Sequence, residues 1–330
     1  MTTPTYRSAL VSRRGGPETI ELALRELRPP TGREVRVRML AASLTADDVA
    51  NRVGNRPILS PLPFVPGYAI IGEVDALGPD AAGLRVGDRV AALLQIGGHA
   101  DFIYIDAAEL CPVPTGLDPV KAAPLILNYL VAYQALHRVA GVREGQSALV
   151  VGASGGVGTA LLELGRLAGL RMYGLASPRK HADVAALGAT PIDYHGDVLQ
   201  AIRAAAPEGV DYVFNGMADE YFGTGIKALR RGGVLVHYGG PESMWGLVAL
   251  VAKLLFFTIW PNGKHVRGYG THRVPHAQRA ADWTALFSLL ADGAIDPKIA
   301  AVYPLSEIVA ANEHLERGDV VGTIVIRGEG

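Results

Sequence analysis

Glycine spacing in the middle of the chain is the feature that points most directly to chemistry. In SALVVGASGGVGTALLELGRLAG an apolar run leads into Gly152, and an amphipathic stretch follows Gly158. Glycines in such a turn let the backbone approach a pyrophosphate, and the start of the next helix supplies N–H groups and a positive dipole end. The spacing is G-x-x-G-x-x-G, and the alternative is a tight strand-to-helix turn without a ligand. The pattern favours a dinucleotide site made of Gly152, Ser154, Gly155, Gly156 and Val157.

The residues after the next apolar run indicate which dinucleotide is bound. NAD sites usually have an acid about 20 residues after the glycines, where it binds the ribose 2′-hydroxyl. Here RMYGLASPRKHAD has no acid before Asp183, and Ser177, Arg179 and Lys180 stand in its place. Ser177 and Pro178 suit the N-cap and first position of a helix, and two cations in its first turn favour a bound anion. A solvated basic turn is the alternative; the pattern favours the 2′-phosphate of NADPH.

Six apolar runs and the helical segments between them predict the scaffold that positions these residues. Strand-like runs alternate with amphipathic stretches from about residue 126 onward, which is typical of a doubly wound parallel sheet of the Rossmann kind. The predicted strands cover residues 147–152, 171–176, 191–194, 210–214, 233–238 and 266–269.

The rest of the chain has a different pattern. Short β-branched runs separated by proline and glycine, such as REVRVRML and IIGEVDALG, fill the first 125 residues. Two helical segments and a last apolar strand, VVGTIVIRG, follow residue 271. The sequence therefore predicts two domains in an α/β protein: a mainly-β domain made of residues 1–125 and 271–330, and a parallel-sheet domain of residues 126–270.

Composition and charge argue against several classes of function. The 330 residues are 49% hydrophobic and 19% charged, and a net charge of −1 without blocks of like charge does not favour nucleic acid or an anionic membrane. With Cys111 as its one cysteine, the chain has no internal disulfide and no multi-cysteine metal site.

The apolar segment 246–260 is shorter than the roughly 20 residues that span a bilayer and contains Lys253, so a buried or interface helix is favoured over a membrane-contacting surface. Without a secretory signal, we expect a cytoplasmic protein with no transmembrane segment.

Five stretches resemble the medium-chain dehydrogenase/reductase superfamily, and within it the zinc-free quinone oxidoreductase branch. In order along nearly the whole chain they are PLPFVPG…GEV, VGDRV, GGHADF, LNYLVAYQAL and VVGASGGVG. ASPRKHADVAALGATPIDYHGD is most similar to relatives of vesicle amine transport protein. The resemblance implies a discontinuous GroES-like, mainly-β catalytic domain, a Rossmann domain and a homodimer, for which strand 266–269 is the expected joint.

The same resemblance bears on metal binding. Zinc-dependent members have a cysteine at the position of Thr45 and a His-Glu pair where this chain has Tyr68 and Ala69. They also have a lobe with four closely spaced cysteines, which this sequence lacks. The resemblance therefore implies chemistry without a metal.

Candidate catalytic residues follow from the same resemblance. Thr45 replaces the usual pocket asparagine and can still donate a hydrogen bond, while Asp48 is expected to organise the loop. Tyr68 either places its hydroxyl at the substrate or only packs its ring. Positions that match cofactor contacts in relatives are Asn128, which is also a catalytic candidate, Tyr194 and Gly239.

The implied activity is hydride transfer from NADPH to a quinone or an α,β-unsaturated carbonyl compound. The protein would contribute orientation and hydrogen-bond donors for the developing negative charge. Two alternatives stay open. One is an NADPH-binding protein with little turnover, as among crystallin-like or vesicle-associated relatives; the other is a pathway-specific enoyl or carbonyl reductase whose acceptor site is lined by the apolar segment 246–260.

Overall fold

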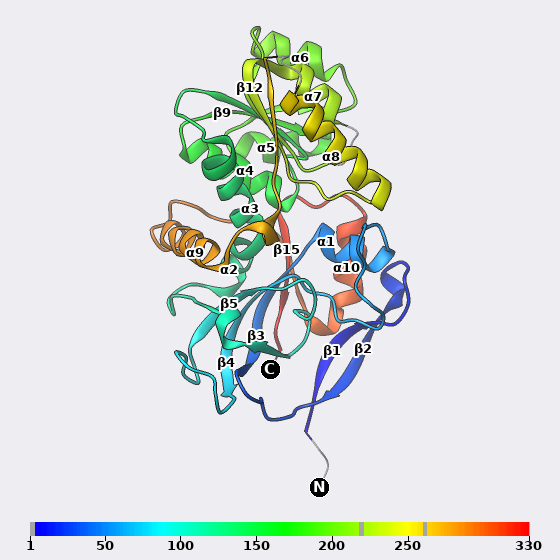
Figure 1. Ribbon diagram of the computed structural model, residues 1–330, viewed down its shortest axis with the longest axis vertical. Helices are drawn as coiled ribbons and strands as arrows, with labels where there is room; N and C mark the ends of the chain where they lie inside the picture. Colours follow the sequence, from blue (N-terminus) through cyan, green and yellow to red (C-terminus); the bar gives the residue numbers. More distant parts are fainter. Residues whose placement is uncertain (1–3, 218–220, 260–262, 330) are drawn as a thin grey trace. The chain divides into compact units, whose positions relative to one another are not determined.

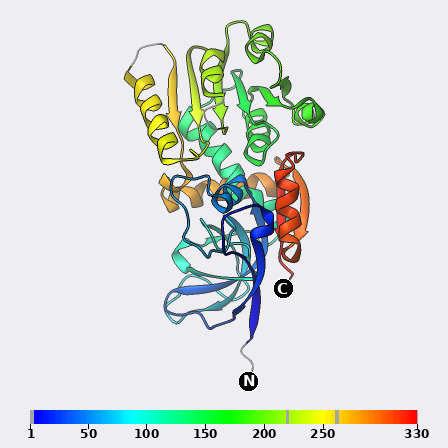
Figure 2. The same cartoon turned by 90° about the vertical axis from the view of Figure 1, so that its right-hand side faces the viewer.

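A computed structural model describes residues 4–217, 221–259 and 263–329 (Figures 1 and 2). The chain forms two compact units. Unit 1 contains residues 1–55, 59–127 and 276–330, and unit 2 contains residues 56–58 and 128–275.

Unit 1 is built on a seven-stranded sheet in the order β14-β15-β3-β4-β5-β7, with β6 paired to β3. All of these pairings are antiparallel except β14 with β15. A separate hairpin joins β1 (Thr5–Val11) and β2 (Ile20–Glu26). The sheet strands are β3 (Glu34–Leu44), β4 (Ala69–Leu77), β5 (Arg89–Leu93), β6 (Phe102–Asp106), β7 (Cys111–Pro112), β14 (Ile299–Pro304) and β15 (Thr323–Arg327); the helices are α1 (Ala46–Val53), α2 (Pro119–Pro124), α9 (His276–Ala291) and α10 (Ile308–Glu316).

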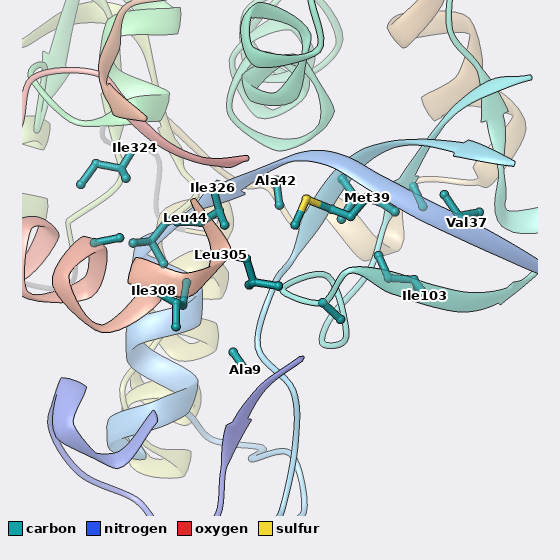
Figure 3. Packing of buried hydrophobic residues seen from close by; sticks show 14 of the residues in the cluster. Ala9, Val37, Met39, Ala42, Leu44, Ile103, Leu305, Ile308, Ile324 and Ile326 are labelled. Atoms are coloured by element: carbon teal, nitrogen blue, oxygen red, sulfur yellow. The ribbon is translucent and has the colours of Figure 1, made fainter. Parts of the chain in front are cut away.

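The core of unit 1 forms because β3 alternates between apolar and charged residues. In EVRVRML every second side chain is buried, which places Val35, Val37 and Met39 on one face. These side chains join Ile326 of β15 and Ile308 of α10 in one buried cluster (Figure 3). The first and last parts of the chain therefore share a single core.

Unit 2 contains a six-stranded parallel sheet in the order β10-β9-β8-β11-β12-β13. Its strands lie where the sequence predicts them, although β12 begins four residues before the predicted start at 233. They are β8 (Ser147–Val151), β9 (Arg171–Ala176), β10 (Thr190–Asp193), β11 (Val210–Asn215), β12 (Leu229–His237) and β13 (His265–Gly268); the helices are α3 (Leu130–Tyr133), α4 (Gly156–Leu167), α5 (His181–Ala186), α6 (Val198–Ala205), α7 (Phe222–Ala228) and α8 (Met244–Ile259).

Helices cover both faces of this sheet. On one face, Gly174 of β9 lies directly under side chains of α4 and α5. On the other, Leu175 of β9 shares a buried cluster with Ile202 of α6 and Phe222 of α7. A strand order that winds outward in both directions from β8 and β11, with both faces covered, confirms the predicted Rossmann-type sheet.

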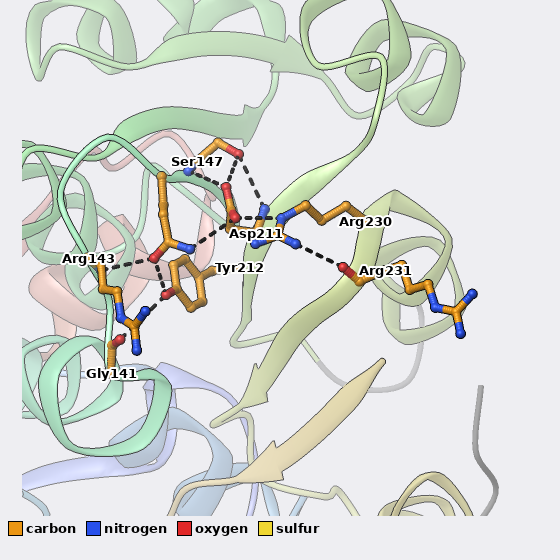
Figure 4. Close-up of polar contacts among 8 residues, drawn as sticks. Gly141, Arg143, Ser147, Asp211, Tyr212, Arg230 and Arg231 are labelled. Carbon is orange, nitrogen blue, oxygen red and sulfur yellow. Dashed lines mark hydrogen bonds and ion pairs between the residues drawn. The ribbon is translucent and has the colours of Figure 1, made fainter. Parts of the chain in front are cut away.

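Asp211 connects the amino ends of three neighbouring strands (Figure 4). Its carboxylate accepts hydrogen bonds from the Ser147 backbone N at 2.8 Å, from Gln146 Nε2 at 3.1 Å and from Arg230 Nε at 2.6 Å. Burial opposes ionisation, but these donors outweigh it and lower the pKa of Asp211. The network fixes β8, β11 and β12 at one edge of the sheet, and the opposite edge carries the predicted cofactor residues.

Candidate functional site

The predicted cofactor residues of unit 2 follow the carboxyl ends of its parallel strands. Gly152 follows β8, Ser177 follows β9, Tyr194 follows β10 and Gly239 comes two residues after β12. In a parallel sheet these ends share one edge, and ligands bind outside that edge where the strand order reverses. Here the reversal lies between β8 and β11. The fold therefore brings these segments to one edge of the sheet.

The glycine-rich turn after β8 leaves no room for a side chain at the place where the first turn of α4 packs against it. Gly152 has φ +75°, in the left-handed region that favours glycine. A Cβ atom on Gly158 would lie 2.2 Å from the Gly152 carbonyl oxygen and 2.7 Å from the Ala153 carbonyl carbon. Gly155 is the N-cap of α4 and has no capping side chain, so the first N–H groups of the helix, at Gly156 and Val157, stay open to a ligand. This cradle fits the pyrophosphate of a dinucleotide.

Asn215, which ends β11, and the next two residues, Gly216 and Met217, belong to the same edge, and sequence reasoning missed them. A Cβ atom on Gly239 would lie 2.6 Å from the Gly216 carbonyl oxygen, and one on Gly152 would lie 3.6 Å from Met217 Sδ. Asn215 is fully buried, and its Oδ1 accepts a hydrogen bond from Met217 N at 3.0 Å. Within the described residues its Nδ2 has no hydrogen-bond partner. The signal in the sequence is the Asn-Gly pair that ends an apolar strand in VDYVFNG.

Lys180 and Ser154 are brought together although 26 positions separate them. Lys180 Nζ donates a hydrogen bond to Ser154 Oγ at 3.3 Å, which places the cation beside the glycine-rich turn. Arg179 is exposed, and Tyr194 is 39% exposed with its ring against His195. The basic segment after β9 thus lies at the turn that would hold the phosphates.

The helix start predicted at Ser177 and Pro178 is wrong in one respect. Pro178–Lys180 form a 3-10 turn, and the α-helix begins only at His181. The Ser177 side chain is buried and makes no capping hydrogen bond. Pro178 cannot donate a backbone hydrogen bond, and its ring fixes φ. The chain therefore forms a narrower 3-10 turn before the α-helix begins. An anion is therefore favoured here by the position of Lys180 beside Ser154, and not by the dipole of α5.

In unit 1, Thr45 and Asp48 form a capping box at the start of α1. Asp48 Oδ2 accepts hydrogen bonds from Thr45 N at 2.9 Å and from Thr45 Oγ1 at 2.7 Å, and Thr45 Oγ1 accepts one from Asp48 N at 3.3 Å. Both residues are buried. The Thr45 hydroxyl therefore donates a hydrogen bond to Asp48, and its oxygen caps the helix by accepting one from Asp48 N.

The same carboxylate holds the loop that carries Tyr68. Asp48 Oδ1 accepts a hydrogen bond from Gly67 N at 2.8 Å, and β4 begins one residue after Tyr68. Gly67 has φ +111°, and a Cβ atom there would lie 2.3 Å from His99 N. Tyr68 itself is 6% exposed. Asp48 thus sets the position of Tyr68 relative to Thr45.

Replacing Asp48 with asparagine should destabilise unit 1. An amide at this position places a donor group among the donors of Thr45 and Gly67, so at least one charge-assisted hydrogen bond is lost in a buried site. We expect the free energy of unfolding in urea to fall by about 2–4 kcal/mol. The control is Asp47→Asn in the same helical turn, which removes the same charge outside the capping box. Equal losses for the two variants would show that Asp48 has no special role.

His99 is completely buried next to this cluster. Burial lowers the pKa of its imidazole below the usual 6.5, although the charge of Asp48 opposes the shift. The unfolded chain then binds a proton at a higher pH than the folded chain. The stability contributed by neutral His99 is therefore present above pH 6.5 and declines below it, toward the folded-state pKa, by at most about 1.4 kcal/mol per pH unit.

This linkage predicts a pH-dependent difference between the wild type and His99→Gln. Between pH 7.5 and pH 5.5 the urea midpoint of the wild type should fall more than that of the variant, which has no group to titrate at this position. Measuring both midpoints at both pH values checks the prediction. Parallel changes would mean that residue 99 does not contribute to the acid sensitivity.

Asn128 lies in unit 2, in the π-helical turn Leu125–Tyr129, and is 5% exposed. Wide turns of this kind are frequent at functional sites. The next residue, Tyr129, donates a hydrogen bond to Glu163 of α4, the helix that follows the glycine-rich turn. The position of Asn128 is thereby coupled to the element that would hold the cofactor.

Two kinds of feature are absent from the described residues. No three His, Cys, Asp or Glu side chains lie close enough together to hold a metal ion. Within the same residues, no helix has the length and apolar character needed to cross a membrane.

Two family models match the sequence. Residues 31–119 match the alcohol dehydrogenase GroES-like domain, and residues 187–326 match the family described as zinc-binding dehydrogenase. Except for residues 56–58, the first match lies in unit 1, and the second begins in unit 2 and ends in unit 1.

Individual relatives cover almost the whole chain. The synaptic vesicle membrane protein VAT-1 homolog of Rattus norvegicus is 30% identical over 98% of this chain and 84% of its own length. The quinone oxidoreductase of Homo sapiens is 27% identical over 94% of each chain. Among solved structures, mycobacterial Rv1454c complexed with NADPH aligns with a TM-score of 0.84 at 24% identity and covers 98% of this chain and 99% of its own.

Proposed function

Because this chain belongs to the medium-chain dehydrogenase/reductase superfamily of oxidoreductases, we propose that it is a zinc-independent, NADPH-dependent reductase of quinones or α,β-unsaturated carbonyl compounds. The observation that carries the proposal is the cradle at the sheet edge of unit 2, where Gly158 and Gly239 exclude any side chain. The relative named as a quinone oxidoreductase and the NADPH complex of a protein with the same fold support it. We also propose that the reductase acts in the cytoplasm.

The proposed cofactor residues form two groups, one for the central pyrophosphate and one for the adenosine ribose. Gly152, Gly155 and the first N–H groups of α4 would bind the pyrophosphate. Ser177, Arg179 and Lys180 would bind the 2′-phosphate, with Tyr194 at the neighbouring strand end. When bound, the nicotinamide would supply a hydride to the acceptor.

The remaining candidates would act on the acceptor. Tyr68 and Asn128 carry hydrogen-bond donors for the oxygen on which negative charge develops. Because the Thr45 hydroxyl donates to Asp48, we assign Thr45 a positioning role, in which it holds α1 and the loop before Tyr68. The proton that completes reduction of the acceptor would come from water or a nearby hydroxyl.

The decisive experiment measures NADPH binding and NADPH consumption separately. Calorimetric titration reports binding, and absorbance at 340 nm reports oxidation with a panel of benzoquinones, naphthoquinones and enones. Binding with turnover on at least one acceptor supports a reductase. Binding without turnover on the whole panel would favour the alternative of a nicotinamide-binding protein, and absence of binding would refute both.

We also propose a homodimer joined through β13. This strand is the last in the sheet of unit 2, and within the described residues its outer edge pairs with no other strand. An open edge of this kind can pair with a second copy of itself. Sedimentation equilibrium measures the mass directly, and a monomer at all concentrations would contradict the proposal.

A further inference from the structure

Met217 places a thioether against the glycine-rich turn of unit 2. A Cβ atom on Gly152 would lie 3.6 Å from Met217 Sδ and 3.7 Å from Met217 Cγ, which are ordinary van der Waals contacts. The sulfur therefore lies beside the turn that is proposed to bind the pyrophosphate. The Met217 side chain is 43% exposed, so small solutes reach it from the solvent.

The backbone of Met217 is held on both sides. Asn215 Oδ1 accepts a hydrogen bond from Met217 N at 3.0 Å, and Asn215 is fully buried at the end of β11. A Cβ atom on Gly239 would lie 3.3 Å from the Met217 carbonyl oxygen, so the segment after β12 packs against the other side. A more polar group at position 217 would therefore stay beside the turn, because the backbone that carries it has no room to move away.

Among the described residues, Met217 is the methionine that combines exposure with a place at this turn. Met39 and Met172 are buried. Met244 is also exposed, but it lies at the start of α8, outside the glycine-rich turn. Burial raises the pKa of the thiol of Cys111, the one cysteine, which keeps it protonated and slow to react with oxidants. Met217 and Met244 are therefore the sulfur atoms that a mild oxidant reaches first.

We propose that Met217 is an oxidation site that controls binding of the cofactor. A peroxide would transfer one oxygen atom to Sδ: the O–O bond breaks, the sulfur loses two electrons, and the second oxygen leaves as water or as an alcohol. The sulfoxide oxygen carries partial negative charge and accepts hydrogen bonds. Beside Gly152 it would repel the pyrophosphate and compete for the open N–H groups at the start of α4. A methionine sulfoxide reductase would restore the thioether, so the change is reversible.

This inference rests on the proposed cofactor site, and hydrogen peroxide treatment of the full chain tests it. Calorimetric titration gives the dissociation constant of NADPH before treatment and after removal of the peroxide, and mass spectrometry locates each sulfoxide. In the wild type the dissociation constant should rise at least about 10-fold, as expected when one charge-assisted hydrogen bond is lost. Methionine sulfoxide reductase should reverse the rise.

Two variants separate Met217 from the other exposed methionine. Met217→Leu, compared with its own untreated sample, should keep its affinity for NADPH after peroxide treatment. Met244→Leu is the matched control and should lose affinity as the wild type does. An equal loss in Met217→Leu would place the sensitive group elsewhere and overturn the inference.

A second measurement needs no variant. Saturating NADP⁺ should slow formation of the sulfoxide at Met217 and leave the rate at Met244 unchanged, because the cofactor would cover the glycine-rich turn. A rate at Met217 that NADP⁺ does not change overturns the inference, and so does complete oxidation of Met217 without loss of affinity. If the untreated wild type binds no NADPH, the proposed function fails as well, so the two failures are distinguishable.

Discussion

Gly158→Ala should weaken NADPH binding at least about 100-fold. The added Cβ atom would lie 2.2 Å from the Gly152 carbonyl oxygen, far inside van der Waals contact, so α4 must move away from the turn after β8. A charge-assisted hydrogen bond from a backbone N–H to the pyrophosphate contributes about 1.5–3 kcal/mol, so losing one or two of them gives a factor of that size. Overpacking should also lower the free energy of unfolding by about 1–3 kcal/mol. Calorimetric titration and urea unfolding measure the two effects.

Two alanine variants serve as controls for this prediction. Gly223 lies in α7 of the same unit, and no atom lies within 4 Å of the place that a Cβ atom would take there, so Gly223→Ala should leave binding and stability nearly unchanged. For Gly155 the nearest atom would lie at 3.5 Å, an ordinary contact, so Gly155→Ala should fold normally and affect only the approach of the ligand. If Gly158→Ala binds NADPH as the wild type does, the glycine-rich turn is not the pyrophosphate site.

Replacing Arg179 and Lys180 together with alanine should lower the preference for NADPH over NADH by about 10- to 100-fold. The reason is the position of Lys180, whose Nζ lies 3.3 Å from Ser154 Oγ at the glycine-rich turn. A charge-assisted hydrogen bond to a phosphate contributes about 1.5–3 kcal/mol, and NADH has no 2′-phosphate to receive it. Dissociation constants for both cofactors, measured at the same ionic strength, give the ratio.

The control for this prediction is Arg203→Ala, which removes an exposed cation from α6 in the same unit. It should leave the ratio of the two affinities unchanged. A double variant whose affinities for NADPH and NADH fall equally would show that the basic segment acts on the fold or on the pyrophosphate. A wild type that binds both cofactors equally would contradict recognition of the 2′-phosphate at once.

Periodicity in the sequence was sufficient to predict the parallel sheet. Apolar runs of five or six residues alternate with amphipathic helices, and this pattern has few solutions other than a doubly wound sheet. Short β-branched runs separated by proline and glycine predicted the mainly-β unit, where alternation along β3 predicts one buried face. The family resemblance added that this unit is GroES-like. Both patterns involve residues that lie close together in the chain, so one sequence is enough to detect them.

Contacts between distant residues could not be predicted in the same way. The cap at Ser177 follows a good sequence rule, but the rule does not tell whether the chain enters a 3-10 turn first. The capping box of Thr45 and Asp48 has a local signature, whereas the hydrogen bond from Gly67 N to Asp48 joins positions 19 apart. The apolar content of α8 is plain in the sequence, but which of its faces stays exposed depends on where β13 and α7 lie.

The pairing of β15 with β3 has a consequence for biosynthesis. Leu44 and Ile324 are partners in this ladder although 280 positions separate them, so the sheet of unit 1 cannot be completed until the ribosome has synthesised β15. At about 5–20 residues per second, nascent β3 waits roughly 15–60 s for its neighbour. The six strands of unit 2 all emerge within that interval. A chaperone that binds nascent chains would therefore bind the unpaired edge of β3. A chain that stops before Thr323 would contain all strands of unit 2 but would lack a strand in the sheet of unit 1.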